Sequence, residues 1–360
     1  MAIETRGWPD LAISPGELLA ETLDSLSLKQ AELARRTGRP VQAINEIVKG
    51  VKEITPETAL QFERVLGVPA HIWTRLEADY RQDLARLHDR KRLEEREVPL
   101  ARQFPYREMA AYGWVPDVKD WLDRAVELLR FFRVSSLDHV QERELEAAWR
   151  RSAKVAASRE ALRAWLMRGE RDAEGVQVAA FGRDALQETL PELRRLTRGS
   201  PAVFCPRMTK LLAGCGVALV FVRHLPRTGA QGATQWVGRK AVIQLSVRYR
   251  WADIFWFSLF HELGHLLLHQ HKGVFVNPSS GEKSDREQEA DVFASDALIP
   301  PASYKRFVDS CEVFSADPVE SFAREVEVHP SIVVGRLKHE GLLPHSHLND
   351  LRPRFDIVDE

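Results

Sequence analysis

The chain has 360 residues, of which 44% are hydrophobic and 29% charged, and its formal net charge is −1. This length exceeds what one compact core needs, so we expect two or three domains of an ordinary soluble globular protein. The near-zero charge excludes a global attraction to nucleic acid, so a DNA-binding surface has to be a local basic patch. The three cysteines, which lie far apart, argue against a disulfide scaffold and indicate a reducing compartment: Cys205, Cys215 and Cys311.

The N-terminus and the apolar stretches decide the expected location. The first residues lack a charged region followed by an apolar run, so the sequence predicts no signal peptide. The longest apolar stretch, Ile254 to Leu268, is interrupted by two histidines and a glutamate, which favours a buried helix over a membrane span. We therefore expect a cytoplasmic protein that makes no membrane contact.

Residues 10–80 are expected to form an all-α domain of successive short helices. Ser14 precedes a proline and starts the first helix. Ser27, followed three residues later by a glutamine, predicts a capping box that opens the second helix. Gly38 is expected to end that helix, and Thr55 to cap the fourth.

The arrangement of these helices is typical of a helix-turn-helix, whose second helix enters the major groove of DNA. That helix is expected over Pro40–Lys49. Arginine suits guanine, glutamine and asparagine suit adenine, and lysines at the helix end suit phosphates. The residues expected at the DNA are Arg39, Gln42, Asn45, Lys49 and Lys52.

Charge supports this interpretation but leaves an alternative. Residues 29–52 hold six basic side chains against two acidic ones, a net of +4 in a near-neutral chain. However, Glu46 in mid-helix would repel phosphate, and Val41 is unusual at an exposed helix start. Both favour the alternative of a four-helix module that binds protein. Because one module reads few bases, DNA binding predicts a homodimer on a two-fold operator in double-stranded DNA.

Residues 81–199 are charged and helical, with no β-rich run. A solvated helix is expected to continue until Pro99, and the amphipathic segments beyond it have a 3.6-residue period. We expect a helical connector with a small core of its own. The sequence assigns no chemistry to it.

Residues 200–348 are expected to form an α+β domain. GVALVFVRHL at 216–225 and KAVIQLSVRY at 240–249 predict strands, and Gly238-Arg239 predicts the hairpin turn before the second. A histidine-rich helix follows, then a loop, another helix and two closing helices. We expect the second strand to offer its edge to an extended peptide.

The histidine-rich helix contains the pattern His-Glu-x-x-His. His261 and His265 lie one turn apart on one face, so both imidazoles can bind one Zn²⁺. Glu262 lies beside that face and can take a proton from water as a general base. Two histidines and a glutamate in such an apolar helix would be costly without a metal or polar partners. We expect a zinc site, with Mn²⁺ as the alternative metal.

The third ligand has two candidates in the sequence. His271 falls at the third histidine of HExxHxxGxxH, but that pattern needs glycine where this chain has Leu268. A second helix is expected to start near Asp285, and it carries Glu287 on a face of small apolar residues. Asp291, one turn on, would accept a hydrogen bond from a ligating histidine. We expect Glu287 to complete the site, with His271 or no protein ligand as the alternatives.

This assignment has three consequences for the surrounding residues. Glu262 would act first as a general base and then as the proton donor to the leaving amine. His269 and His271 would be bystanders at the end of the helix. The candidates for stabilising the oxyanion, which the sequence does not rank, are His224, Arg248 and Tyr249.

Residues 240–301 resemble the ImmA/IrrE metallopeptidase family, whose pattern is HExxH followed by E-x-E-A-N-x-F-A-x-x-L-L-x-P. The resemblance implies a gluzincin-like zinc peptidase, and well-understood members cleave helix-turn-helix repressors. Carried over by position, the metal ligands would be His261, His265 and Glu287, with Glu262 as the base. The chain departs from the pattern at Asp291, where the family usually has Asn, which adds a charge near the metal.

Residues 14–75 resemble the DNA-binding domains of HigA-type antitoxins, notably in ITPETALQFERVLGVPAHIW. Together the two resemblances imply a DNA-binding regulator fused to a zinc endopeptidase. Its substrate would be a repressor or a partner protein, such as a toxin, in a stress, phage or toxin–antitoxin switch. The alternative is an antitoxin-like repressor or toxin-binding protein whose metal site is structural or inactive.

Overall fold

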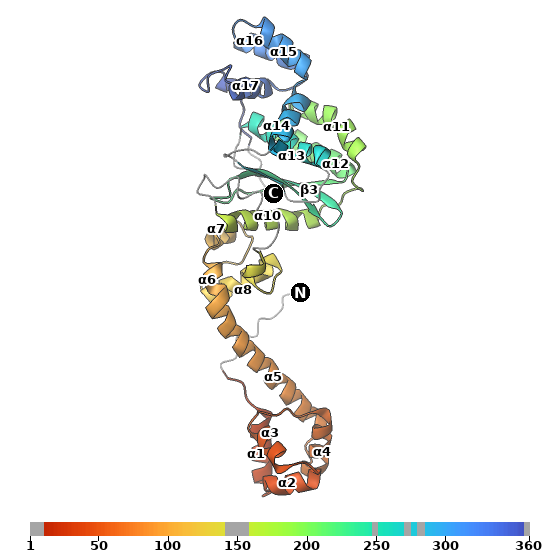
Figure 1. Cartoon of the computed structure of the whole chain (residues 1–360), viewed down its shortest axis with the longest axis vertical. Helices are drawn as coiled ribbons and strands as arrows, with labels where there is room; N and C mark the ends of the chain where they lie inside the picture. Colours follow the sequence, from red (N-terminus) through yellow and green to blue (C-terminus); the bar gives the residue numbers. More distant parts are fainter. Residues whose placement is uncertain (1–10, 141–157, 247–250, 270–274, 279–284, 356–360) are drawn as a thin grey trace. The chain divides into compact units, whose positions relative to one another are not determined.

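The computed structural model describes residues 11–140, 158–246, 251–269, 275–278 and 285–355. Contacts within the chain divide it into two compact units, Met1–Pro99 and Leu100–Glu360. Figure 1 shows the helices and strands of both units. The domain boundaries expected near residues 80 and 200 remain a prediction.

The described part of the N-terminal unit is helical (Figure 1). Phe62 and Trp73, both fully buried, meet edge to face at the centre of its core, with 5.5 Å between the ring centroids. Leucines and isoleucines from the first three helices pack around them. The elements are α1 (Pro15–Ser25), α2 (Gln30–Thr37), α3 (Val41–Val48), α4 (Pro56–Leu66), α5 (Ala70–Arg92), the π-helical turn η1 (Leu93–Glu97) and α6 (Val98–Ala101), which crosses the unit boundary.

The ends of these helices test the capping predictions. Ser14 accepts a hydrogen bond from the Gly16 amide and Thr55 accepts one from the Thr58 amide, which confirms two of the N-caps. Gly38 ends α2 in the left-handed region, with φ of 69°, as expected. The capping box at Ser27 was wrong: Ser27 itself has φ of 50°, and α2 begins at Gln30 with Lys29 as an N-cap that makes no side-chain hydrogen bond.

The second unit combines helices with one four-stranded sheet. Two long helices, α10 and α13, make the most extensive contacts with the sheet, one on each of its faces. Its elements are α7 (Tyr106–Ala111), α8 (Trp121–Phe132), η2 (Leu137–Val140), α10 (Arg159–Glu174), α11 (Arg183–Leu196), α12 (Pro201–Gly214), β1 (Val217–Val222), β2 (Ala230–Val237), β3 (Lys240–Ser246), α13 (Ala252–Leu268), β4 (Phe275–Pro278), α14 (Asp285–Leu298), α15 (Pro301–Ser310), α16 (Ala316–Glu325), α17 (Pro330–His339) and η3 (Asn349–Leu351).

The strand order is β1-β3-β2-β4, with β1 parallel to β3 and the other neighbours antiparallel. The predicted hairpin joins β2 to β3, and Gly238 occupies its turn with φ of 63°. The expectation that β3 offers a free edge was wrong, because β1 pairs with it on one side and β2 on the other. Parallel pairing with an earlier strand leaves no local signal in the sequence.

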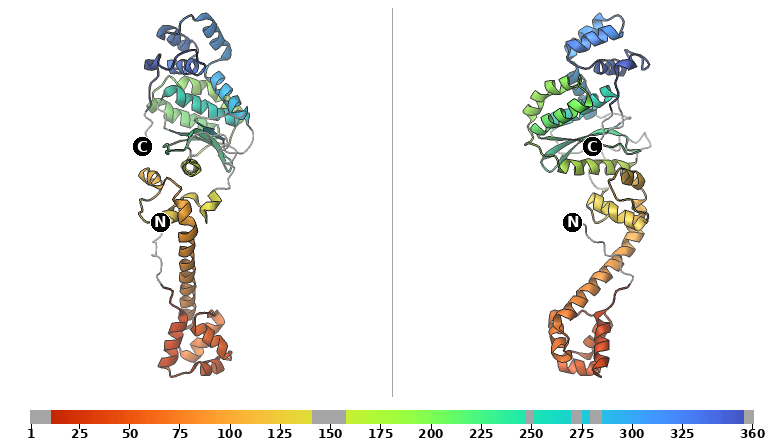
Figure 2. Two further views of the ribbon diagram at one scale, coloured as in Figure 1. Left: turned by 60° about the vertical axis from the view of Figure 1, so that its left-hand side comes forward. Right: turned by 180° about the vertical axis from the view of Figure 1, so that it is seen from behind.

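Helix α10 covers one face of the sheet, and α12 and α13 cover the other (Figures 1 and 2). Two buried glutamine side chains attach α10 to the sheet: Gln235 donates to the Leu166 carbonyl and Gln244 to the Trp165 carbonyl. Lys240 donates to two carbonyls at the end of α10, where a positive charge is favourable. Helix α10 is therefore packed into the same unit as the sheet.

Among the described residues, no helix is long and apolar enough to cross a membrane. The main core of the second unit lies between the sheet and the helices on the α13 side, and it is rich in aromatic rings. Helix α13 is buried along nearly its whole length. It is therefore the element whose polar side chains most need an explanation.

Candidate metal centre

Helix α13 places three polar side chains in the core. His261, Glu262 and His265 are all fully buried. Helix α14 packs closely on the same part of α13, because the facing residues are small. At Gly264 an added Cβ would lie only 3.0 Å from the Phe293 ring and 3.3 Å from the Ala290 Cα, so glycine lets the two helices approach this closely.

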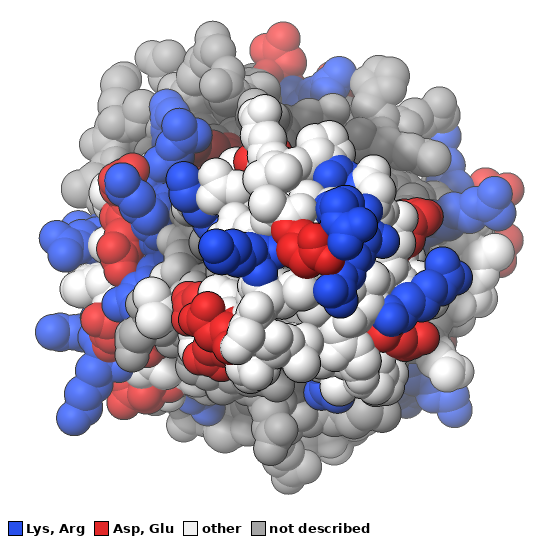
Figure 3. Space-filling model, turned by 90° about the horizontal axis from the view of Figure 1, so that it is seen from below, with Lys and Arg blue, Asp and Glu red and all other residues white. Residues whose placement is uncertain are grey.

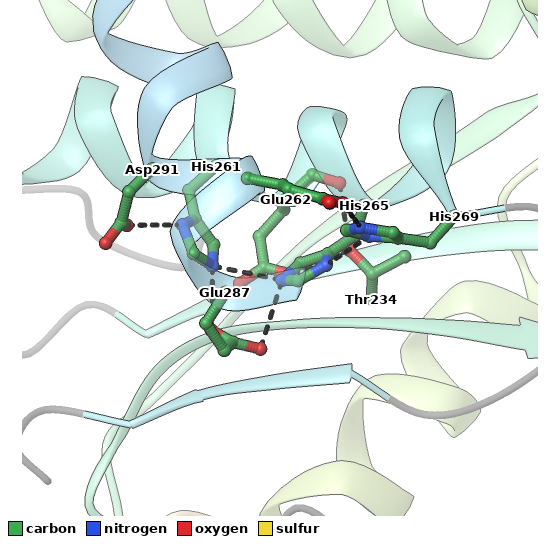
Figure 4. A network of polar contacts seen from close by, with 8 residues as sticks. Thr234, His261, Glu262, His265, His269, Glu287 and Asp291 are labelled. Carbon is green, nitrogen blue, oxygen red and sulfur yellow. Dashed lines mark hydrogen bonds and ion pairs between the residues drawn. The ribbon is translucent and has the colours of Figure 1, made fainter. Parts of the chain in front are cut away.

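The ligand atoms expected from the sequence converge at this contact (Figure 4). The Nε2 atoms of His261 and His265 lie 3.0 Å apart. The carboxylate of Glu287, from α14, lies 3.2 Å from the first Nε2 and 3.4 Å from the second. One ligand atom from each residue lies within 4.8 Å of the others, and this is the only such cluster among the described residues. Two imidazoles and a carboxylate are the donor set of a zinc site with an open position.

Asp291 lies on the far side of His261, as the spacing predicted. Its Oδ1 is 2.9 Å from Nδ1 of His261, so the imidazole donates there when Nε2 faces the cluster. The contact fixes both the tautomer and the plane of the ring. Asp291, at the position where the pattern quoted above has asparagine, thus makes the hydrogen bond expected of it.

Glu262 points away from the ligand carboxylate, towards the sheet (Figure 4). The Thr234 hydroxyl, on β2, donates to its Oε2 at 2.6 Å. A Cβ at Gly232 would lie 2.5 Å from its Oε1, so the strand leaves room for the carboxylate. None of the described residues hydrogen-bonds that Oε1. A buried carboxylate oxygen to which no described residue donates suits a group that binds water.

Electrostatics at the cluster follow from burial and from the carboxylates. Burial raises the pKa of Glu262 to about 8. Burial lowers the pKa of His261, but its hydrogen bonds with Asp291 and Glu287 outweigh that effect and raise it to about 9. Burial raises the pKa of Glu287, but the two histidines outweigh it and lower it to about 2. The site thus favours positive charge near its ligands, as a cation requires.

His269 was expected to be a bystander, and here the sequence interpretation missed a contact. Helix α13 ends at Leu268, and His269 leaves it with an extended backbone. Its buried ring lies with Nδ1 3.1 Å from Nδ1 of His265 and Nε2 3.0 Å from Glu289. The four-residue spacing from His265 was the available signal. His271 lies outside the described residues.

The oxyanion candidates stay open. Arg248 and Tyr249 lie outside the described residues. His224 follows β1, where its Nδ1 lies 3.0 Å from the Thr228 hydroxyl and 3.5 Å from that of Ser246.

The residues expected at DNA lie on and beside α3. Gln42 is exposed and donates to Glu46 at 2.9 Å, while Arg39 is half-buried and donates to Gln61. Asn45 is half-buried, and the two lysines are exposed at the end of α3 and beyond it: Lys49 and Lys52. The structure therefore keeps all five near the second helix of the motif.

Charge on the N-terminal unit is mixed. Glu32 forms ion pairs with Arg35 and Arg36, and hydrogen bonds from these two arginines lower its pKa to about 2. Acidic side chains stand among the basic ones on the face in Figure 3. Val41 is 50% exposed at the start of α3, as the sequence suggested. The net positive charge of residues 29–52 therefore comes from basic and acidic side chains mixed together, and not from a purely basic patch.

Comparisons with known proteins separate the two ends of the chain. Residues 19–73 match the helix-turn-helix family. Residues 234–338 match a peptidase family described as the IrrE N-terminal-like domain. That match includes Thr234, the two histidines and glutamate of α13, and the α14 carboxylates. No curated protein matches the chain.

Solved structures similar to part of the chain include antitoxins and a protein bound to operator DNA. An addiction module antidote protein of the HigA family from Coxiella burnetii is 30% identical, covering 23% of this chain and 92% of that chain, with a TM-score of 0.22. Antitoxin HigA from Pseudomonas aeruginosa, solved with the higBA promoter, is 28% identical over 24% of this chain and 94% of its own, with a TM-score of 0.22. PA4674 from Pseudomonas aeruginosa, solved with its 18 bp operator DNA, is 29% identical, covering 21% of this chain and 82% of its own, with a TM-score of 0.20.

The two family matches coincide with the two resemblances seen in the sequence. The chain thus joins an N-terminal helix-turn-helix domain to a C-terminal metallopeptidase-like domain of the IrrE N-terminal-like family.

Proposed function

We propose that this protein is a DNA-binding regulator that carries a zinc-dependent endopeptidase. The observation that carries the proposal is the buried convergence of His261, His265 and Glu287, with Glu262 beside it. Burying such a cluster in an apolar core costs desolvation free energy, which a bound cation would offset. The family match of the domain supports peptide-bond hydrolysis as the reaction.

The proposed roles follow from the contacts of each side chain. His261, His265 and Glu287 would hold the metal, and Asp291 would orient His261. A bound Zn²⁺ supplies Lewis acidity and makes water nucleophilic near neutral pH. Glu262, held by Thr234, would take a proton from the attacking water and pass it to the leaving amine. Its free Oε1 is the atom proposed to face that water.

The N-terminal domain is proposed to bind an operator in double-stranded DNA. Helix α3 would enter the major groove, with Arg39, Gln42 and Asn45 near the bases and two lysines at phosphates. Glu46 holds the amide nitrogen of Gln42, which leaves the amide oxygen free to accept from adenine. A homodimer on a two-fold site is the proposed binding form.

The proposed substrate is a repressor or a partner protein in a stress, phage or toxin–antitoxin switch. Fusion to a DNA-binding domain would concentrate the peptidase where such proteins act. The rival function is an antitoxin-like repressor with a structural metal. The complete burial of both histidines favours that rival, because structural zinc sites are closed to solvent.

One experiment separates the two functions. Full-length protein and its Glu262→Gln variant would each be co-expressed with candidate repressors and toxins from the same operon or neighbouring ones. We expect both proteins to retain zinc, and only the first to cleave a candidate. Glu312→Gln removes an exposed carboxylate from the same unit and serves as the matched control. Equal survival of every candidate with both proteins would leave the structural metal as the better account.

A further inference from the structure

The end of helix α13 holds a chain of polar contacts, from a buried ligand to the surface, that neither the metal ligands nor the general base accounts for. It runs from His265 to His269 and from there to Glu289 on α14. His269 is buried, whereas the Glu289 side chain is 61% exposed. A buried histidine beside a buried ligand is costly unless its hydrogen bonds are satisfied.

The directions of these hydrogen bonds follow from the proposed metal site, on which this inference rests. If His265 binds a cation through Nε2, its proton is on Nδ1, which must donate. Nδ1 of His269 lies 3.1 Å from this atom, within hydrogen-bonding distance, and in this contact it accepts. His269 then carries its proton on Nε2, and this atom donates to Glu289 Oε2 at 3.0 Å. One arrangement of protons thus makes both of these hydrogen bonds at once.

We propose that His269 and Glu289 are positioning residues that orient His265 for metal binding. The two ligand histidines would then be held in parallel ways from the same helix. Asp291 reaches His261 directly, whereas Glu289 reaches His265 through the intervening ring of His269.

The geometry of α14 explains why the second connection needs an extra residue. Glu287 and Asp291 are one turn apart, so both side chains face α13. Glu289 lies between them in sequence and points elsewhere on the helix, as its exposure shows. His269 closes the distance because α13 ends at Leu268, and its backbone turns out of the helix while its amide still bonds the His265 carbonyl.

The test measures zinc affinity by competition with a chromophoric chelator, using the full-length protein. His269→Phe keeps a ring but removes both hydrogen bonds, and we expect it to weaken zinc binding roughly 10–100-fold. His269→Asn retains an acceptor near the position of Nδ1 and should restore part of the affinity. Glu289→Ala should weaken binding by less, since its carboxylate is exposed. In the Co²⁺-loaded protein the visible spectrum of His269→Phe should shift, because the His265 ring is no longer fixed.

Glu312→Ala is the matched control for the exposed glutamate, and thermal unfolding of the metal-free variants reports on folding. If the role is merely structural, the variants should unfold at a lower temperature while the folded protein keeps its zinc affinity. A second contrary result would be a zinc affinity within twofold of the unaltered protein in both His269→Phe and Glu289→Ala. Either result overturns the positioning role alone. If the unaltered protein binds no zinc, the proposed metal site fails and this inference fails with it. Glu289→Ala keeps the test valid if His269→Phe does not fold, because Glu289 is on the surface.

Discussion

The two candidate sites of this chain use polar side chains in opposite ways. At the candidate metal centre, two histidines and two glutamates lie inside a packed core, and the positions of α13, α14 and β2 fix them. On α3, the side chains expected at DNA are exposed or half-buried, and their partners are near neighbours on the surface. A buried site therefore depends on a few residues completely, whereas a surface site divides its free energy among many residues, each worth little.

Removing a metal ligand should give the largest effect. Glu287→Ala is expected to lower zinc affinity by more than the roughly 10–100-fold that loss of a partner outside the ligand set costs. Both imidazoles would then face each other at 3.0 Å with no carboxylate between them. Zinc content after dialysis measures the loss. Gln288→Ala, at an exposed neighbour on α14, should keep the metal, and full zinc content in the Glu287 variant would show that another residue completes the site.

The second prediction concerns pH and the metal-free protein. The pKa of Glu262 is raised by burial from 4.5 to about 8, so the folded state holds a proton that the unfolded chain releases. Its favourable contribution is full below pH 4.5 and is lost as the pH rises to about 8. Glu262→Gln keeps a neutral group throughout. It should therefore stabilise the chelator-treated protein at pH 8 by a few kcal/mol, at about 1.4 kcal/mol per pKa unit.

Thermal or urea unfolding at pH 8 and at pH 5 tests this. The gain should be small at pH 5, and Glu312→Gln should show none at either pH. An equal gain at both values would mean that shape or packing, and not the buried charge, determines the cost at this position.

The third prediction applies to the surface site and is smaller. Gln42→Ala should cost about 1–3 kcal/mol against the preferred operator and less against other sequences, because one base contact is lost. Measurement requires duplexes that vary one base pair at a time, in fixed salt. Gln82→Ala, an exposed glutamine on α5, is the control. A uniform loss over all duplexes would remove Gln42 from base recognition.

The smallest effect is expected from one phosphate contact. Lys52→Ala should weaken binding to all duplexes alike and reduce the slope of log affinity against log salt by about 0.9. Lys91→Ala, exposed on α5, should leave the slope unchanged. If the slope of Lys52→Ala matches that of the unaltered protein, the lysine does not contact phosphate. If binding by the unaltered protein shows no salt dependence at all, the protein-binding alternative is favoured.

Much of the fold could be predicted from local patterns. The caps at Ser14 and Thr55, the glycine after α2 and the hairpin at Gly238 depend on residues within a few positions of one another, so the sequence contains the whole signal. Ser27 shows the limit, because its capping box depends on where α1 ends, and α1 ends at Ser25, two residues before Ser27 adopts the left-handed conformation. Strand β3 shows a second limit, since its pairing with β1 depends on a distant segment.

The metal centre divides in the same way. His261 and His265 lie one turn apart on one helix with Glu262 beside them, and Glu287 and Asp291 lie one turn apart on another, so helical periodicity alone places each pair on one face. The meeting of the two helices required the small residues at their contact, which include Gly264. What followed from the sequence was the chemistry of each helix.

Only the tertiary structure decided what surrounds that chemistry. Thr234 reaches Glu262 from a strand 28 residues away, and no periodic pattern relates a strand to a helix. His269 became a partner of His265 because the helix stops at Leu268 and the ring turns inward. Local spacing determines which side chains share a face, since backbone geometry repeats. Which helix or strand faces pack together depends on the free energy of packing the whole core, and no single segment of the sequence contains that information.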